Sequence, residues 1–133
     1  MPAKPVLRSP VAAVLAAEGF AVWAVFSTVP WLSGGAGLRE AWDSNAFWSL
    51  GLPVLMVSLA AAGALSQQSP WRLAAAAVAG HFLGVVLIAK AGSGFNLLPL
   101  TLTLVGAPMF AVLAGFGWAG RWLRQLTQPA NLA

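Results

Sequence analysis

Hydrophobic residues along this chain gather into four long blocks that are separated by short polar connections. The blocks cover residues 11–32, 46–65, 71–91 and 97–123. Each block has about 20 residues or a few more, the length that a helix needs to cross roughly 30 Å of hydrocarbon. Backbone groups inside a bilayer must pair internally, and four uninterrupted apolar runs cannot form a strand barrel. The pattern therefore predicts an all-α integral membrane protein, with four transmembrane helices in a compact bundle.

The connections between the blocks are short and rich in turn-forming residues. They cover residues 33–45, 66–70 and 92–96, so we expect the whole chain of 133 residues to form a single domain. Ser69 and Pro70 are typical of a helix start, with serine as the N-cap and proline at the first helical position. Asp43 or Ser44 is expected to cap the second helix in the same way. Pro108 lies deep in the fourth block and is expected to kink that helix, because proline lacks a backbone N–H.

The composition supports the same class of protein. Hydrophobic residues make up 59% of the chain and charged residues only 8%, against roughly 25% charged in a soluble domain. A soluble fold of this size could not bury so much apolar surface. The basic residues are scattered singly between the blocks, a distribution that indicates membrane topology and argues against a nucleic-acid partner. The absence of cysteine excludes disulfides, thiolate metal sites and cysteine nucleophiles.

Basic residues are distributed unevenly about the four blocks. One side of the predicted bundle has Lys4, Arg8, Arg72, Arg121 and Arg124, and the other has Arg39 and Lys90. Cytoplasmic ends of transmembrane segments are enriched in Lys and Arg, so we expect both termini in the cytoplasm and a multi-pass location in the cell (inner) membrane. Tryptophans near the block ends are typical of an aromatic belt, with Trp31, Trp42 and Trp48 outside and Trp71 and Trp122 inside.

Two ionisable residues lie inside the apolar blocks, Glu18 in the first and His81 in the third. A rise of about 1.5 Å per residue places the two side chains within roughly one helical turn of each other in depth. A carboxylate that faces lipid costs about 2.5–3.5 kcal/mol on insertion scales. We therefore expect Glu18 to face protein or a water-filled cavity.

Ridges of small residues border both positions. They comprise Ala13, Ala17, Ala21 and Ala24 in the first block, and Ala74, Ala77, His81 and Gly84 in the third. Small residues are found where membrane helices approach closely, so the pattern predicts a contact between Glu18 and His81. Two roles for this contact stay open: it holds the bundle together, or it binds and moves a proton.

The first outer connection combines charged and aromatic residues. Arg39, Glu40 and Asp43 lie within five positions, and Trp42 separates the acidic pair. One interpretation is an outer docking surface, and the other is an interfacial turn with Trp42 anchored at headgroup depth. Lys90, at the outer end of the third block, is expected to pair with Glu40 or Asp43 and tie the outer connections together.

An internal repeat is only weakly indicated by the sequence. Both outer connections are rich in glycine, with "GGAG" at residues 34–37 and "GSG" at residues 92–94. Glycine is common in loops, and the four blocks show no further match to one another. The sequence therefore gives little reason to divide the chain into related halves.

No motif for catalysis or for a bound group is present in the sequence. It lacks a glycine-rich phosphate loop after a strand, a His/Cys/Asp cluster suited to a metal, and a Ser–His–acid set. His81 can supply one axial haem ligand, but haem between helices usually needs a second ligand. We therefore expect no enzymatic activity, no cofactor and no metal, with a redox subunit that borrows a ligand as a minor alternative.

The stretch "AAEGF" at residues 16–20, in a chain with four short apolar helices, resembles the small multidrug resistance transporters. In that family a membrane-embedded glutamate of the first helix exchanges protons for cationic drugs within a dimer. The resemblance covers the helix count and one position, and it implies Glu18 as the exchanging residue. The charged first outer connection and His81 depart from the family. With no tyrosine in the chain, an aromatic cage for a cation would come from Trp23 and nearby phenylalanines.

Two functional hypotheses follow from these features. In the first, the protein acts by helix association, as an accessory or assembly subunit of a membrane complex or as a homo-oligomer. In the second, it is a small proton-coupled transporter that uses Glu18 with His81. The partners expected in either case are the lipid bilayer and other membrane subunits or further copies of the chain.

Overall fold

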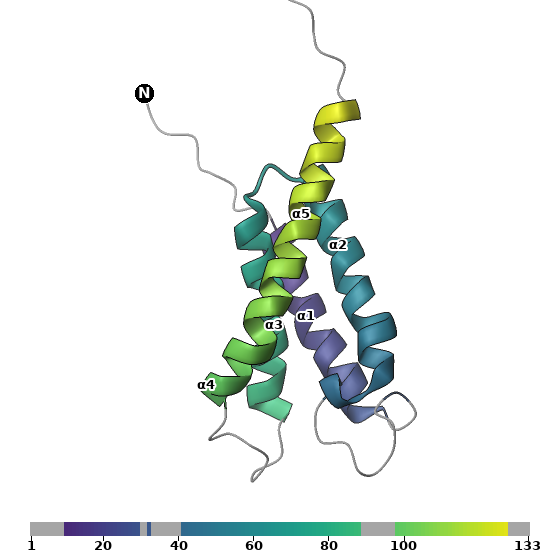
Figure 1. The fold of residues 1–133 in the computed structure, drawn as a ribbon, viewed down its shortest axis with the longest axis vertical. Helices are drawn as coiled ribbons and strands as arrows, with labels where there is room; N and C mark the ends of the chain where they lie inside the picture. Colours follow the sequence, from purple (N-terminus) through teal and green to yellow (C-terminus); the bar gives the residue numbers. More distant parts are fainter. Residues whose placement is uncertain (1–9, 30–31, 33–40, 89–97, 128–133) are drawn as a thin grey trace, which may run out of the picture.

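The computed structural model of the protein describes residues 10–29, 32, 41–88 and 98–127, and the elements in this part of the chain are helices (Figure 1). In chain order they are α1 (Val11–Thr28), η1 (Ala41–Asp43), η2 (Phe47–Gly51), α2 (Leu52–Leu65), α3 (Pro70–Ile88), α4 (Leu98–Thr101), η4 (Leu102–Gly106) and α5 (Ala107–Thr127). Four segments are long and apolar enough to cross a membrane: Val11–Thr28, Phe47–Leu65, Pro70–Ile88 and Leu102–Thr127. The predicted all-α architecture with four such helices is confirmed.

Most helix ends follow the local signals of the sequence. α1 ends at Thr28, before the predicted limit of residue 32, and Val29 has extended backbone with φ −82° and ψ 115°. Val29 precedes Pro30, and the residue before a proline is disfavoured in the helical region. α3 begins at Pro70, as predicted, and α5 continues past residue 123 to Thr127.

Two of the long helices contain a π-helical turn just before a proline. η2 ends at Gly51, two residues before Pro53, and η4 ends at Gly106, two residues before Pro108. A proline inside a helix lacks a donor, and its ring clashes with the carbonyl four residues earlier. A wider turn moves that carbonyl away from the ring. The predicted disturbance at Pro108 therefore takes the form of a π-helical turn, and Pro53 causes a second one.

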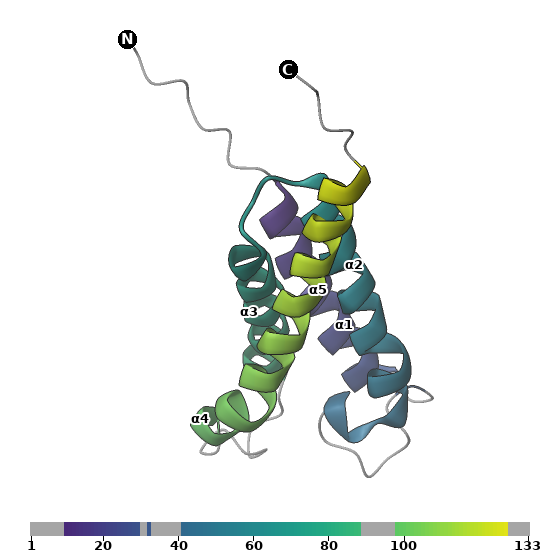
Figure 2. The same cartoon turned by 45° about the horizontal axis from the view of Figure 1, so that its top comes forward.

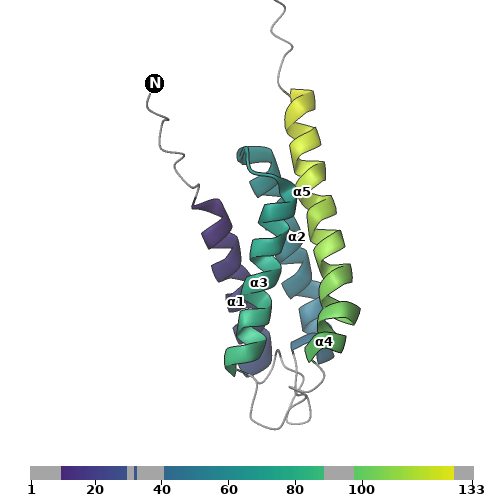
Figure 3. The same cartoon turned by 90° about the vertical axis from the view of Figure 1, so that its left-hand side faces the viewer.

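The helices form two parallel pairs that pack against each other. α1 and α3 run side by side in one direction, and α2 and α5 run side by side in the opposite direction (Figures 1 and 3). The connection at residues 66–69 joins α2 to α3 at the end of the bundle where α1 begins and α5 ends (Figure 2). The two pairs are formed by helices that are not consecutive in the sequence.

Close backbone contact holds α1 against α3. A Cβ atom added to Gly19 would overlap the carbonyl oxygen of Ala77. One added to Gly80 would overlap the carbonyl oxygen of Ala16. The two helices approach each other so closely because neither glycine has a side chain at the contact.

The same kind of contact holds α2 against α5. A Cβ atom added to Gly63 would overlap the carbonyl oxygen of Gly117, and one added to Gly120 would overlap that of Ala60. Both helix pairs are therefore joined through glycine, with the larger apolar side chains filling the space between the pairs.

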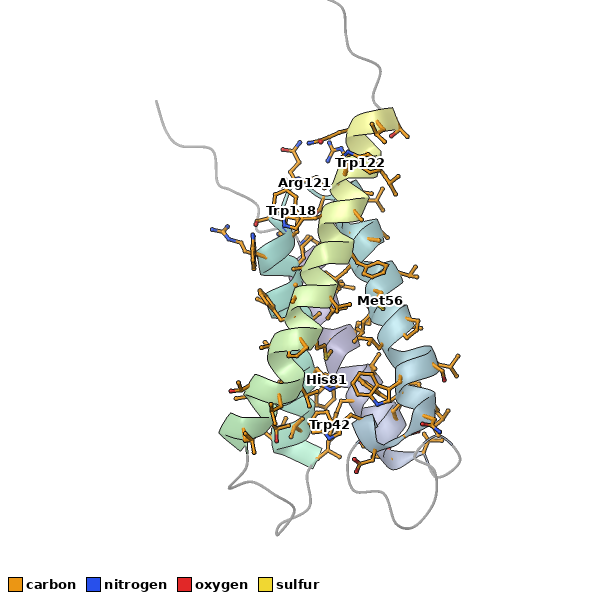
Figure 4. All side chains as sticks on the ribbon, viewed as in Figure 1. Trp42, Met56, His81, Trp118, Arg121 and Trp122 are labelled. Atoms are coloured by element: carbon orange, nitrogen blue, oxygen red, sulfur yellow. The ribbon has the colours of Figure 1, made fainter. Side chains whose placement is uncertain are left out.

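Two arginines near the end of α5 donate hydrogen bonds to the connection between α2 and α3. Arg121 Nη2 donates a hydrogen bond to the carbonyl of Gln67 at 3.3 Å, and Arg124 Nη1 donates to the carbonyl of Ser66 at 3.4 Å. The Arg121 guanidinium also lies over the Trp118 ring, 5.9 Å from its centroid, in the upper part of Figure 4. These arginines satisfy carbonyls that follow the end of α2.

Candidate functional site

Glu18 lies on α1 and faces α2. Ser58 Oγ, on α2, donates a hydrogen bond of 2.6 Å to Glu18 Oε1. The neighbouring residue Gly19 occupies the contact with α3, and successive helical residues point about 100° apart. Glu18 is therefore turned away from α3, and its half-buried carboxylate contacts the other helix pair.

A groove runs between α1 and α2 beside this hydrogen bond. It is open toward the outside of the bundle, has a volume of about 300 Å³, and is lined by Pro10, Val11, Val14, Leu15, Glu18, Ser58, Ala61 and Ala62. Glu18 and Ser58 are the polar side chains of this lining, and the rest are apolar. The groove thus combines an apolar wall with one acidic group about seven residues from the start of α1.

The small-residue ridge predicted on the first block is exposed. Ala13, Ala17 and Ala21 are exposed on the surface of α1, and Ala24 is half-buried. The expectation that this ridge is where a neighbouring helix approaches is therefore wrong within the molecule, because α3 uses the adjacent face of α1 instead. On α3, in contrast, all members of the predicted ridge are buried: Ala74, Ala77, His81 and Gly84.

His81 lies in an aromatic cluster away from the groove. Its ring centroid is 5.1 Å from that of Trp23, 5.4 Å from Phe47, 5.8 Å from Phe82 and 5.9 Å from Trp42. Figure 4 shows His81 beside Trp42 in the lower part of the bundle. The side chain is fully buried, and neither Nδ1 nor Nε2 has a hydrogen-bond partner among the described residues.

The predicted contact between Glu18 and His81 is therefore not formed. Glu18 bonds to Ser58 across the α1–α2 side, whereas His81 packs among aromatic rings on the α1–α3 side. Trp23, proposed as part of a cation cage, is buried in the same aromatic cluster and does not line the groove. The physical reason is the glycine contact at Gly19, which places α3 against the Ala16–Gly19 face of α1 and leaves Glu18 to face α2.

The outer-connection residues are described only in part. Arg39, Glu40 and Lys90 lie outside the described residues. Trp42 is half-buried and packs against Trp23, with ring centroids 4.6 Å apart and ring planes tilted by 54°, so it points into the bundle instead of outward to an interface. Asp43 is exposed.

Ser44 is the cap expected for the second helix. Its Oγ accepts a hydrogen bond of 3.1 Å from the backbone N–H of Ala46 and donates one to the carbonyl of Leu32. The indole Nε1 of Trp48 donates to the carbonyl of Trp42 at 2.7 Å. These bonds fix the turn that leads from η1 into η2, which indicates a structural role for this segment.

Ser58 is the site residue that the sequence analysis did not single out. It lies seven positions before the end of α2 at Leu65, and Glu18 lies seven positions after the start of α1 at Val11. Both helix ends are at the same end of the bundle. Because each residue of a helix rises about 1.5 Å, an equal number of residues from the shared end places Ser58 at the same depth as Glu18. The serine could have been found in the sequence by this count.

Neither side chain belongs to a group that could hold a metal. Within the described ranges, no three His, Cys, Asp or Glu residues lie together. The arrangement at the groove can accept a hydrogen bond or a proton at Glu18, and it can bind a donor group that enters from the side. No known family, curated protein or solved structure matches this chain.

Proposed function

We propose that the chain is a multi-pass protein of the cell (inner) membrane that acts by associating with another transmembrane helix. The contact would be made at the α1–α2 face, either by a further copy of the chain or by a subunit of a larger membrane complex. The observation that carries this proposal is the Glu18–Ser58 hydrogen bond in a groove that opens to the side of the bundle. The exposed ridge of Ala13, Ala17 and Ala21 on the same helix supports the proposal, because small residues suit close helix packing.

The energetics of the carboxylate favour a covered groove. A carboxylate toward lipid costs about 2.5–3.5 kcal/mol on insertion scales, and Glu18 is only half-buried in the isolated chain. A helix that packs over the groove would shield Glu18 from lipid and could donate a hydrogen bond to its carboxylate. Interhelical hydrogen bonds in membranes contribute about 0.6 kcal/mol on average, so the packing against the alanines would supply much of the association energy.

The arrangement of charge supports cytoplasmic termini. Arg72, Arg121 and Arg124 lie at the end of the bundle where α1 begins and α5 ends. Asp43 lies at the opposite end, in η1. Arginine at the ends of transmembrane helices is typical of the cytoplasmic side.

The test is co-purification from the native membrane with a tagged chain, using an untagged second copy to detect self-association. We expect a membrane protein, either the second copy or another subunit, to be recovered in fixed stoichiometry. Ala17→Leu adds bulk to the exposed ridge and should reduce the recovery at least several-fold. Ala79→Leu, at an exposed position of α3, is the matched control and should leave recovery unchanged. A monomeric chain with no stoichiometric companion would contradict the proposal.

A second candidate function is proton-coupled transport at Glu18. The groove, at about 300 Å³, reaches the lower end of the range for small-molecule sites. Ionisable residues inside membrane helices are often proton-binding residues. In this candidate Ser58, not His81, assists the carboxylate, because Ser58 is its hydrogen-bond partner. Proton movement into proteoliposomes, recorded with an internal pH dye, should then be lost in Glu18→Gln and kept in His81→Phe.

A further inference from the structure

Arg121 and Arg124 bring two positive charges together near the end of α5. Their guanidinium groups donate to the carbonyls of Gln67 and Ser66, which are consecutive residues of the connection between α2 and α3. The two arginines are three positions apart, and residues at that spacing lie on the same face of a helix. At 3.3 and 3.4 Å the two hydrogen bonds are longer than the usual length of about 2.9–3.0 Å. Each guanidinium has five N–H donors, so most of its capacity to donate is left over from these bonds.

Carboxylates do not balance this charge in the part of the chain that the structure describes. The acidic residues there are Glu18 and Asp43. Glu18 is bonded to Ser58, which lies seven positions, or roughly 10 Å, before Leu65 at the end of α2. Asp43 lies in η1, at the opposite end of the bundle. Arg72, exposed in the first turn of α3, adds a further positive charge to the end that holds the other two arginines.

The last turns of α5 extend beyond the start of α3. A Cβ atom added to Gly117 would lie 3.2 Å from the Pro70 Cβ, so Gly117 is level with the first residue of α3. From there α5 continues to Thr127, about 15 Å further along its axis (Figure 3). Arg121 and Arg124 follow Gly117 by four and seven positions and therefore lie on the same helix face, the one turned toward α3 and the connection. We call this part of the surface, formed by Arg121, Arg124 and residues 66–67, the basic step.

Exposed tryptophan rings mark the depth of the basic step in a bilayer. They belong to Trp71 on α3 and to Trp118 and Trp122 on α5. The Arg121 guanidinium lies over the Trp118 ring (Figure 4). Tryptophan is enriched at the level of the lipid headgroups. Arg121 and Arg124 follow Trp118 by about 5 and 9 Å along the helix axis, and long arginine side chains adjust their depth. The two guanidinium groups therefore reach the layer of lipid phosphates.

We propose that the basic step binds the phosphate of an anionic glycerophospholipid, with Arg121 and Arg124 as the phosphate-binding residues. Arginine pairs its N–H donors with phosphate oxygens in bidentate geometry. Trp118 packs against the glycerol and the upper acyl chains of the same lipid. This inference goes beyond the proposed helix association and does not rest on it, because the basic step is formed by α5 and the connection and not by the α1–α2 groove.

Charge complementarity selects an anionic lipid, such as phosphatidylglycerol, over a zwitterionic one. A choline or ethanolamine headgroup would bring its own positive charge next to Arg121 and Arg124. No carboxylate of the described residues lies there to receive that charge. A headgroup with a net negative charge meets only positive side chains at this place. Basic sites between transmembrane helices at the cytoplasmic side are a common form of anionic lipid recognition.

The first test compares lipids on the unmodified full-length chain. Native mass spectrometry follows the release of the chain from detergent micelles that contain phosphatidylglycerol and phosphatidylcholine in equal amounts and with the same acyl chains. We expect phosphatidylglycerol to be retained at least several-fold more than phosphatidylcholine, and to stay bound when inorganic phosphate is added in excess. Equal retention of the two lipids would overturn the proposal. Displacement by inorganic phosphate would show a site for a soluble anion and overturn the assignment to a lipid.

The second test separates a defined site from diffuse attraction. Arg121→Gln and Arg124→Gln should each weaken the binding of phosphatidylglycerol about five-fold, the contribution expected of one arginine beside an anionic headgroup. Arg72→Gln is the matched control, because it removes the same charge from the same end of the bundle. It should leave the binding nearly unchanged. Equal losses in all three variants would indicate attraction by net charge alone and contradict the site.

The third test needs no substitution, because Arg121 and Arg124 also bond to the connection and their loss can loosen it. Hydrogen exchange of the unmodified chain is compared in nanodiscs of phosphatidylcholine with and without phosphatidylglycerol. A bound phosphate offsets the mutual repulsion of the two arginines and holds them at the connection. Exchange should therefore slow at residues 66–69 and in the last turns of α5, with no change in η1. Unchanged exchange, or equal slowing at both ends of the bundle, would overturn the proposal.

Discussion

His81 is enclosed by aromatic rings from four segments of the chain, α1, η1, η2 and α3. A buried imidazole normally bonds through at least one ring nitrogen. Here neither ring nitrogen has a hydrogen bond of standard geometry among the described residues, although the Gly19 backbone lies close to the ring. The surroundings of this residue therefore suit an apolar ring better than a polar one.

Replacing His81 by phenylalanine tests that reading of the aromatic cluster. His81→Phe keeps a ring of similar size and removes two unsatisfied polar atoms, so we expect stability within about 1.5 kcal/mol of the unmodified chain, or higher. His81→Ala leaves a cavity and should cost about 2–5 kcal/mol. SDS unfolding midpoints measure both changes. A phenylalanine variant as unstable as the alanine variant would indicate a bonded imidazole.

At Ser58, removal of one hydrogen-bond partner should cost more than removal of both. Ser58→Ala leaves the Glu18 carboxylate without the donor it has in the structure, which is expected to cost about 1–3 kcal/mol. The infrared carboxyl band of Glu18 should shift in the same variant. Ser49→Ala is the control, because Ser49 bonds to the Asn45 carbonyl on an exposed surface. An unchanged band in Ser58→Ala would show that the 2.6 Å bond is not formed in the membrane.

Residue-level chemistry could be predicted from the sequence only in part. A carboxylate in an apolar block is conspicuous, so the sequence alone identifies Glu18 as a candidate. The sequence does not identify its partner Ser58, because the direction of a side chain depends on which face of the helix packs. In α1 the packed face is the one that contains Gly19, because the absence of a side chain there lets α3 approach closely.

At the scale of elements, the prolines shape two of the four long helices. The carbonyl of Leu104 lies four residues before Pro108, inside the π-helical turn η4. In an α-helix that carbonyl would clash with the proline ring and would find no donor at position 108. The π-helical turn is therefore a consequence of the proline that follows it.

Pro108→Ala should convert η4 into regular α-helix. The new backbone N–H can bond to the Leu104 carbonyl, so amide hydrogen exchange over Leu102–Gly106 should slow. Stability should rise, by less than the roughly 3 kcal/mol that separates proline from alanine in a regular helix, since the wide turn already accommodates the ring. An unchanged exchange pattern would show that η4 has a cause other than the proline.

The four long helices could be predicted from the sequence, because each apolar block has the length of a helix that crosses a bilayer. The pairing of the helices could not, since it depends on backbone contacts at glycine and not on matching side chains.

At the scale of the whole molecule, the three arginines among the described residues lie at one end of the bundle. Arg72, Arg121 and Arg124 lie there with the start of α1 and the end of α5. Green fluorescent protein fused after the last residue should therefore fluoresce in the cytoplasm, and alkaline phosphatase at the same place should be inactive. A fusion at the amino terminus should report the same side. Termini on opposite sides, or both outside, would contradict this topology.

We propose that the α1–α2 face, with Glu18 in its groove, contacts another helix in the membrane. Photo-cross-linking in intact membranes tests it most directly, with a photoreactive amino acid placed at Ala17 or, as the control, at Ala79. We expect one discrete protein adduct from Ala17 that disappears in the Glu18→Ala/Ser58→Ala background, and no protein adduct from Ala79. Only lipid adducts, in equal amounts from both positions, would contradict it.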